Sequence, residues 1–134
     1  MKFRLTLNDS ADIGLAHSAL FARAITFEEF QDWLYFVVEH ADDPPHFIFD
    51  LIDWDRSVDT HINQVIGWWP STGVETDLDA LLGVGFVRNL CDSCDSMSRE
   101  DAISALKSNA DVLKRLRILM PFVDWDSEVP RHTF

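Results

Sequence analysis

Hydrophobic residues recur along most of the chain at intervals of three and four, the spacing of one face of an α-helix. The clearest example begins at Thr26, which with Glu29 has the S/T-x-x-E form of a capping box. The apolar face of this helix is expected to comprise Phe27, Phe30, Leu34, Val37 and Val38. The opposite, outward stripe comprises Glu28, Asp32, Tyr35 and Glu39. The helix should end before the prolines of the Asp42-Asp43-Pro44-Pro45 turn, because a residue that precedes proline is disfavoured in helical geometry.

The same periodicity predicts helices in the rest of the chain. They are expected over residues 11–24, 45–53 and about 59–67, after Thr76, after a second capping box at Ser98 and Asp101, and between Asn109 and Pro121. Residues 2–7 alternate polar and apolar side chains, which predicts a short N-terminal strand. No linker or repeat interrupts the pattern. The expected fold is mainly α, one compact domain over residues 1–134 with about six helices.

Two of these helices have a specific expected core face. After Thr76 that face is Leu78, Leu81, Leu82, Phe86 and Leu90, with Gly83 and Gly85 permitting close approach of a neighbouring backbone. In the last helix Val112, Leu113, Leu116 and Leu119 are expected inside, and Lys114, Arg115 and Arg117 outside. Both faces would contribute to one core.

Composition supports an independently folding chain. Of the 134 residues, 47% are hydrophobic, which is enough apolar surface to offset the entropy of ordering a domain of this size. No apolar run approaches the ~20 residues of a membrane span, and the N-terminus lacks the apolar stretch of a signal peptide. A cytoplasmic location is therefore expected.

Charge is distributed very unevenly. The net charge of -12 arises within residues 24–87, where thirteen carboxylates face one cation, Arg56. Four of the five tryptophans, Trp33, Trp54, Trp68 and Trp69, lie in the same block. A negative field combined with aromatic area suits the binding of a basic protein and disfavours nucleic acid and anionic membranes. The alternative is that the acidity only maintains solubility.

Motifs for chemistry are sparse. Cys91 and Cys94 form a lone C-x-x-C, whereas structural zinc would require two further ligands; ordinary thiols are the favoured interpretation. His46, Asp50 and Asp53 would share one helical face and form a candidate metal or acid-base site, against the simpler alternative of a local hydrogen bond. The familiar hydrolase, nucleotide-binding and zincin motifs are absent from the sequence. No catalytic residue, metal or cofactor is therefore expected.

A D-W-D tripeptide occurs twice, at residues 53–55 and 124–126. Neither copy has the glycine and terminal glutamate that a calcium-binding EF-hand loop requires. Each tryptophan is expected to anchor its loop in the core or to offer a contact point to a partner.

Two segments resemble a known class of proteins. The stretch Ile25–Leu51, which contains ITFEEFQDWL and DDPPHFIFDL, and the tail MPFVDW at residues 120–125 resemble small bacterial immunity proteins of polymorphic toxin and contact-dependent growth inhibition systems. The resemblance implies a cytoplasmic protein without chemistry of its own, which binds the toxic domain of a cognate effector and neutralises it.

Taken together, the residues and the resemblance predict an antitoxin-like protein. It is expected to bind a basic toxin domain through an acidic surface that carries aromatic groups. The residues expected to bind the partner are Glu28, Asp32, Tyr35, Glu39, Asp42, Asp43, Asp53, Trp54, Asp55 and Asp59. The alternative function is a small metal-dependent enzyme or metal-binding regulator that uses His46, Asp50 and Asp53.

Overall fold

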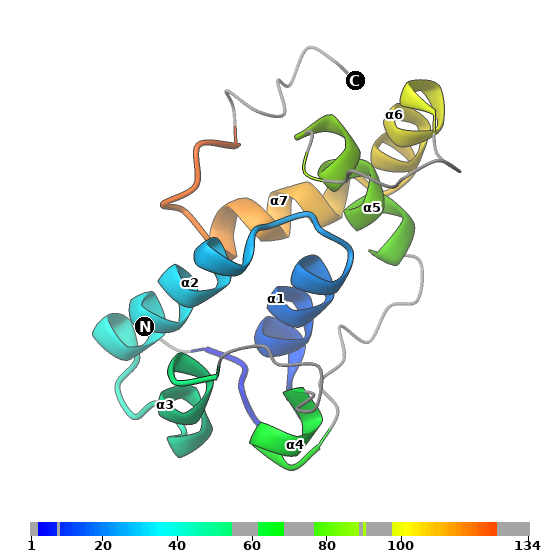
Figure 1. Ribbon diagram of the computed structural model, residues 1–134. Coiled ribbons are helices and arrows are strands. Elements are labelled where there is room, and N and C mark those ends of the chain that lie inside the picture. The colour runs from blue at the N-terminus through cyan, green and yellow to red at the C-terminus, as the bar shows by residue number, and fades with distance from the viewer. Residues whose placement is uncertain are drawn as a thin grey trace.

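The structure is a computed structural model that describes residues 3–7, 9–54, 62–68, 77–88, 90 and 98–125. Seven helices occur in these residues (Figure 1): α1 (Ala11–Phe21), α2 (Phe27–His40), α3 (His46–Ile52), α4 (Ile62–Ile66), α5 (Asp77–Val87), α6 (Arg99–Ser108) and α7 (Ala110–Leu119). The mainly α fold predicted from the sequence is confirmed, with one helix more than the expected number.

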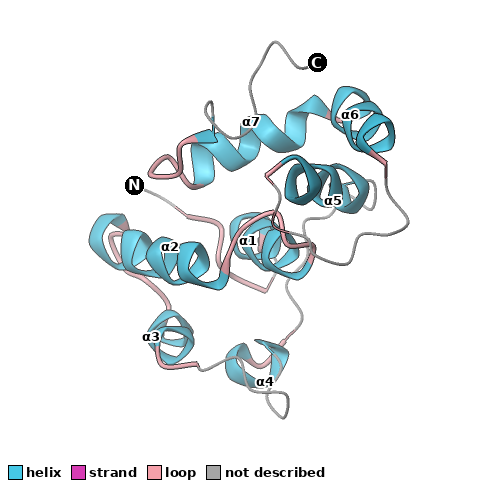
Figure 2. Cartoon of the chain, turned by 45° about the horizontal axis from the view of Figure 1, so that its top comes forward, coloured by secondary structure: helices cyan, strands magenta, loops and turns pink. Residues whose placement is uncertain are grey.

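Helix α1 lies at the centre of the arrangement. It contacts α2 on one side and α5 and α7 on the other, α3 and α4 continue from α2, and α6 packs against α5 (Figure 2). The buried side chains of all these elements except α6's Ala102 belong to one hydrophobic cluster. Five α1 side chains belong to this cluster, those of Ile13, Leu15, Ala16, Ala19 and Leu20, and Phe21 is the one exposed residue of the helix. Such burial is expected of a helix covered by neighbours on several sides.

The predicted N-terminal strand is wrong. Thr6 and Asp9 form only an isolated antiparallel bridge, with N–H to O distances of 3.1 and 3.0 Å, and no strand occurs in the described residues. Arg4 instead forms backbone hydrogen bonds with the first turn of α1. Its carbonyl oxygen accepts from the amides of Asp12 and Ile13, and its own amide donates to the Asp12 carboxylate at 2.7 Å. The segment therefore satisfies free amides at a helix start and pairs with no neighbouring strand.

Helix boundaries follow local signals closely. Thr26 and Glu29 form the predicted capping box of α2, and Ser98 and Asp101 form that of α6. Helix α1 stops before residue 24 because Arg23 adopts a left-handed conformation, with φ of 61°. Helix α4 ends at Ile66, one residue before the expected end, and residues 59–61 of the expected helix lie outside the described residues.

The prediction of the core face is confirmed for α7 and is partly wrong for α5. Val112, Leu113, Leu116 and Leu119 of α7 are all buried. In α5, Leu81 is buried as predicted, whereas Leu82, Phe86 and Leu90 are only partly buried and the side chain of Leu78 lies outside the described part. The remaining buried positions of α5 are its small residues, Ala80, Gly83, Val84 and Gly85.

The two glycines explain why α5 buries its small face. A Cβ atom at Gly83 would lie 2.9 Å from the carbonyl oxygen of Ala102 in α6. At Gly85 it would lie 2.5 Å from the carbonyl oxygen of Arg23, in the turn between α1 and α2. Both distances are shorter than a carbon and an oxygen tolerate, so the close approach predicted for these glycines is confirmed.

A buried ion pair joins α2 to the end of α5. Arg88 donates to both carboxylate oxygens of Glu29, at 2.8 and 2.6 Å, and its side chain is only 3% exposed. The same guanidinium donates to the Ala24 carbonyl at 2.8 Å and lies 4.9 Å from the ring centroid of Trp125. One arginine thus connects the α1–α2 turn, α2, α5 and the segment after α7.

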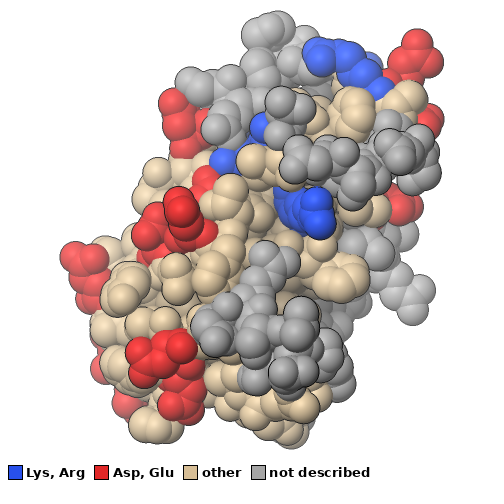
Figure 3. Space-filling model, viewed as in Figure 1, with Lys and Arg blue, Asp and Glu red and all other residues tan. Residues whose placement is uncertain are grey.

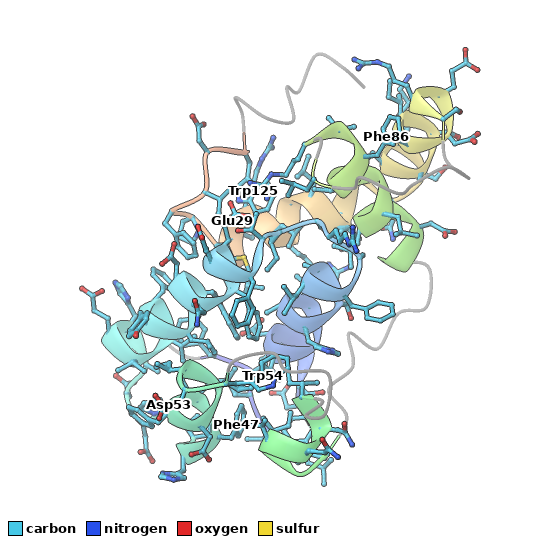
Figure 4. All side chains as sticks on the ribbon, viewed as in Figure 1. Glu29, Phe47, Asp53, Trp54, Phe86 and Trp125 are labelled. Atoms are coloured by element: carbon cyan, nitrogen blue, oxygen red, sulfur yellow. The ribbon has the colours of Figure 1, made fainter. Side chains whose placement is uncertain are left out.

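Trp125 completes this junction from the C-terminal side. It is buried, and its indole N–H donates to the Met120 carbonyl at 2.9 Å. Glu29 and Trp125 lie next to each other above α2 in Figure 4. The prediction that the tryptophan of the second D-W-D tripeptide anchors its loop in the core is therefore confirmed.

Replacing Gly85 by alanine should destabilise the protein although alanine favours helices. The new methyl group would overlap the Arg23 carbonyl, and overpacking of this kind costs about 2 kcal/mol. The free energy of unfolding from urea titration measures the effect. Asp79→Ala, at an exposed position of the same helix, is the control and should leave stability equal or slightly higher. Equal stability of the Gly85→Ala variant would contradict the close contact.

The Glu29–Arg88 pair should make stability depend on pH. Burial alone would raise the pKa of Glu29, but the hydrogen bonds from Arg88 and from the Thr26 amide outweigh it and lower that pKa below its ordinary value of 4.5. The stabilisation is therefore complete above pH 4.5 and is lost as the pH falls through the lowered pKa. Glu29→Gln should cost about 2 kcal/mol at pH 7.

The comparison across pH tests this assignment. The difference in unfolding free energy between the natural protein and the Glu29→Gln variant should shrink steadily below pH 4.5. Glu100→Gln, at an exposed position of α6, is the control. A difference that stays constant down to pH 3 would show that Glu29 stabilises through its shape and not through its charge.

Candidate partner-binding surface

The outward stripe of α2 lies on the surface as predicted. Glu28, Asp32, Tyr35 and Glu39 are all exposed, and the Tyr35 side chain keeps 58% of its accessible area. Their outward orientation results from the helical period, because Phe30, Trp33, Leu34 and Val37 occupy the opposite, buried face. The capping box fixes where the helix begins and hence which residues face outward.

The acidic surface continues through the following turn and onto α3. Asp42 and Asp43 are exposed in the turn, and Asp50 and Asp53 are exposed on and directly after α3. We call the seven exposed carboxylates the acidic ridge: Glu28, Asp32, Glu39, Asp42, Asp43, Asp50 and Asp53. Figure 3 shows acidic side chains along the side of the molecule formed by α2 and α3.

No cation of the same segment offsets this charge. Residues 24–54 contain no lysine or arginine, whereas α6 and α7 carry five: Arg99, Lys107, Lys114, Arg115 and Arg117. Contacts between helices place α3 and α4 on the far side of α2 and α1 from α6. These five cations therefore lie away from the acidic residues of α2 and α3, although α6 and α7 carry three acids of their own.

Helix dipoles make part of the ridge unfavourable for folding. Glu39 lies in the last turn of α2, Asp50 lies in the last turn of α3, and Asp53 occupies the C-cap position of α3. Anions at helix C-termini face the negative end of the dipole. Asp50 and Asp53, three residues apart, also repel each other. Glu39, Asp50 and Asp53 therefore lower stability locally, which distinguishes them from charge that supports the fold.

One carboxylate of residues 24–54 does not belong to the ridge. Glu29 is 19% exposed and its charge is neutralised by Arg88, 59 residues away in the sequence. The segment 24–54, which has no cation of its own, thus contains one acid that is paired in the interior.

The exposed aromatic groups near the ridge are one expected residue, Tyr35, and one unexpected residue, Phe49, which is 44% exposed. Trp33 lies in the same acidic block of the sequence, but it is completely buried and offers no binding area. Phe49 was missed, although it follows His46 by three residues and precedes Asp53 by four, and therefore shares their polar face.

Trp54 has a mainly structural position. It is partly buried against the core and meets the Phe27 ring edge-on, with centroids 6.0 Å apart. Trp68 is also partly buried and meets Phe47 in the same manner at 5.9 Å. In Figure 4, Phe47 and Trp54 point toward α4 and the core while Asp53 points away from it. Asp55, Asp59 and Trp69 lie outside the described residues.

The geometry of the described residues gives little support to the candidate metal site at His46, Asp50 and Asp53. His46 Nε2 lies 3.8 Å from the Asp50 carboxylate, and the two side chains are 89% and 51% exposed. Asp53 is exposed nearby, but no group of three His, Cys, Asp or Glu side chains within the described ranges is arranged to hold a metal ion. Cys91 and Cys94 lie outside those ranges.

Neutralising the end of the ridge should stabilise the protein. Glu39→Gln removes an anion from the C-terminal turn of α2, and the expected gain in unfolding free energy is about 0.5 kcal/mol at low salt. Glu28→Gln, in the first turn of the same helix, is the matched control and should lose a similar amount. Thermal or urea unfolding measures both, and the difference should fall as salt is added. A loss of stability in Glu39→Gln would show that this carboxylate supports the fold.

The described helices include none that combines the length and the apolar character needed to cross a bilayer. Comparisons of the chain with protein-family models, with curated proteins and with solved structures found no match.

Proposed function

We propose that this chain is an immunity protein that binds a basic toxin domain in the cytoplasm and neutralises it through the acidic ridge, with Tyr35 and Phe49 as contact residues. The observation that carries the proposal is the exposed ridge itself, seven carboxylates on α2, α3 and their connecting turn without a lysine or arginine in residues 24–54. The carboxylates at the helix C-termini oppose folding, so a role in binding accounts for them better than a role in stability.

The chemistry of the partner follows from the charge. Proteins that act on nucleic acid carry lysine and arginine to hold phosphates, and a row of carboxylates offers the same groups an alternative set of ligands. Binding of a cationic surface would also relieve the repulsion within the ridge. Opposite charges accelerate association, which benefits an inhibitor that must act before a toxin reaches its substrate.

Tyr35 and Phe49 provide the apolar contact area that the carboxylates of the ridge lack. Exposed carboxylates are well hydrated and contribute mainly to the rate of association, whereas aromatic side chains that become buried contribute most of the retained binding energy. Both rings are exposed in the free chain, at 58% and 44%, and each lies beside acids of the ridge in sequence.

The family resemblance concerns the same part of the molecule. The stretch Ile25–Leu51 that resembles immunity proteins extends from the α1–α2 turn to α3, and it contains six of the seven ridge carboxylates. The second segment, residues 120–125, contains Trp125 and thus supports the Glu29–Arg88 pair on which α2 rests.

Neutralising two ridge acids should slow association with the toxin. The probe is the C-terminal domain encoded by the gene immediately upstream, purified as an inactive variant. Asp32→Asn with Glu39→Gln should lower the association rate several-fold at low salt and make it less dependent on salt. Asp79→Asn with Glu100→Gln removes the same charge from α5 and α6 and should change it little. Biolayer interferometry measures both rates. Absence of binding at low salt, together with no rescue of growth on co-expression, would refute the function.

Removing the Tyr35 ring should instead accelerate dissociation. Because this ring is exposed, Tyr35→Ala is expected to leave the free energy of unfolding nearly unchanged while it weakens binding about tenfold. Phe21→Ala, which removes a 74% exposed ring on α1, is the matched control and should leave binding intact. Equal effects of the two variants would place the contact elsewhere on the molecule.

A further inference from the structure

A cavity of about 250 Å³ lies between the N-terminal segment, the start of α1 and the end of α7. Figure 2 shows the N-terminal segment passing α7 on its way to α1. The apolar wall of the cavity is formed by Phe3, Ala11, Leu15, Ile118 and Leu119. Leu15 and Leu119 are almost completely buried, whereas Ile118 is 72% exposed. The cavity is half enclosed and has an aliphatic side chain at its edge that is not covered by the fold.

The size of the cavity limits what it can hold. Apolar cavities of ~150 Å³ bind benzene, so this volume accommodates one aromatic ring or a short branched chain with a few additional atoms. An apolar group that enters would gain contacts with Leu15 and Leu119 and would cover part of Ile118.

The lining of the cavity includes the carboxylate of Asp12, whose desolvation is only partly offset by its hydrogen bond and by nearby positive charge. Asp12 accepts a hydrogen bond from the Arg4 amide at 2.7 Å. Burial nevertheless raises the pKa of Asp12, because desolvation outweighs this hydrogen bond and the attraction of the Arg4 side chain, and Asp9 adds to the rise. A cationic group beside Asp12 would therefore be attracted to a carboxylate that is partly desolvated.

The two guanidinium groups that line the cavity have carboxylates of their own. Arg4 Nε lies 3.8 Å from Asp9, and Arg115 Nε lies 2.9 Å from Asp111. Among the described residues, Asp12 is the one carboxylate that lines the cavity, and Asp9 and Asp111 lie beside the two arginines.

We propose that this cavity is a binding site for a small monocationic amphiphile, in which an apolar group fills the space beside Leu15 and Ile118 and a single primary ammonium contacts the Asp12 carboxylate. The site does not overlap the acidic ridge, and the proposal stands independently of the proposed function.

Three small molecules with the same ring distinguish the contributions of shape and charge. 2-Phenylethylamine, 2-phenylethanol and 3-phenylpropanoate are titrated into the full-length protein, and the methyl signals of Leu15, Ile118 and Leu119 are followed by NMR. The amine should saturate these signals and bind about tenfold more tightly than the alcohol, because a hydrogen bond to a charged group is worth about that factor. The carboxylate should bind least.

Two variants and a control assign the interaction to the cavity. Asp12→Asn keeps an acceptor for the Arg4 amide and should reduce the affinity for the amine to that of the alcohol. Asp32→Asn removes the same charge from the acidic ridge and should have no effect. Ala11→Phe should fill the cavity and abolish binding of the amine and the alcohol alike.

Other outcomes would overturn the proposal. Equal affinity for the amine and the carboxylate would exclude recognition of charge, and equal behaviour of Asp12→Asn and Asp32→Asn would show attraction to the net charge only. Signal changes confined to α2 and α3 would place the amine on the acidic ridge. If Ala11→Phe fails to fold, the comparison between Asp12→Asn and Asp32→Asn decides the question.

Discussion

The bidentate contact between Glu29 and Arg88 is the interaction on which the remaining structure depends. It is formed by a residue in the first turn of α2 and a residue just beyond α5, and Arg88 also holds the Ala24 carbonyl and the Trp125 ring. A buried guanidinium is costly unless every neighbour satisfies it, so these partners are fixed together. The pair thereby sets the position of α2, and with it the direction in which the outward stripe of α2 faces.

Separation of charge is the second consequence of this arrangement. Glu29 is the one acid of residues 24–54 that receives a buried cation in the described structure, and Arg88 reaches it from outside that segment. The other seven acids of the segment remain on the surface, several of them where helix dipoles disfavour anions. One acidic residue of this segment thus stabilises the fold, whereas the charges of the other seven remain exposed to solvent.

The acidic ridge and the cavity beside Asp12 represent two different uses of a carboxylate. On the ridge the acids are hydrated and numerous, which favours rapid, salt-dependent attraction of a large basic surface. In the cavity a single, partly desolvated acid adjoins an apolar wall, which favours a small ligand with one charge. The two sites share no residue.

Much of the local structure could be predicted from the sequence because its determinants are local. The capping boxes at Thr26 and Ser98, the outward stripe of α2 and the inward face of α7 depend only on residues within a few turns of each other. Tertiary structure decided whatever depends on distant partners. Periodicity on α5 favoured its large leucines, but the approach of the Arg23 and Ala102 carbonyls selected the face with Gly83 and Gly85. The sequence places Trp33 in the acidic block with three other tryptophans, and only packing showed that it is completely buried. Net charge is a property of the sequence, whereas the pairing of Glu29 with a residue 59 positions away required the folded chain.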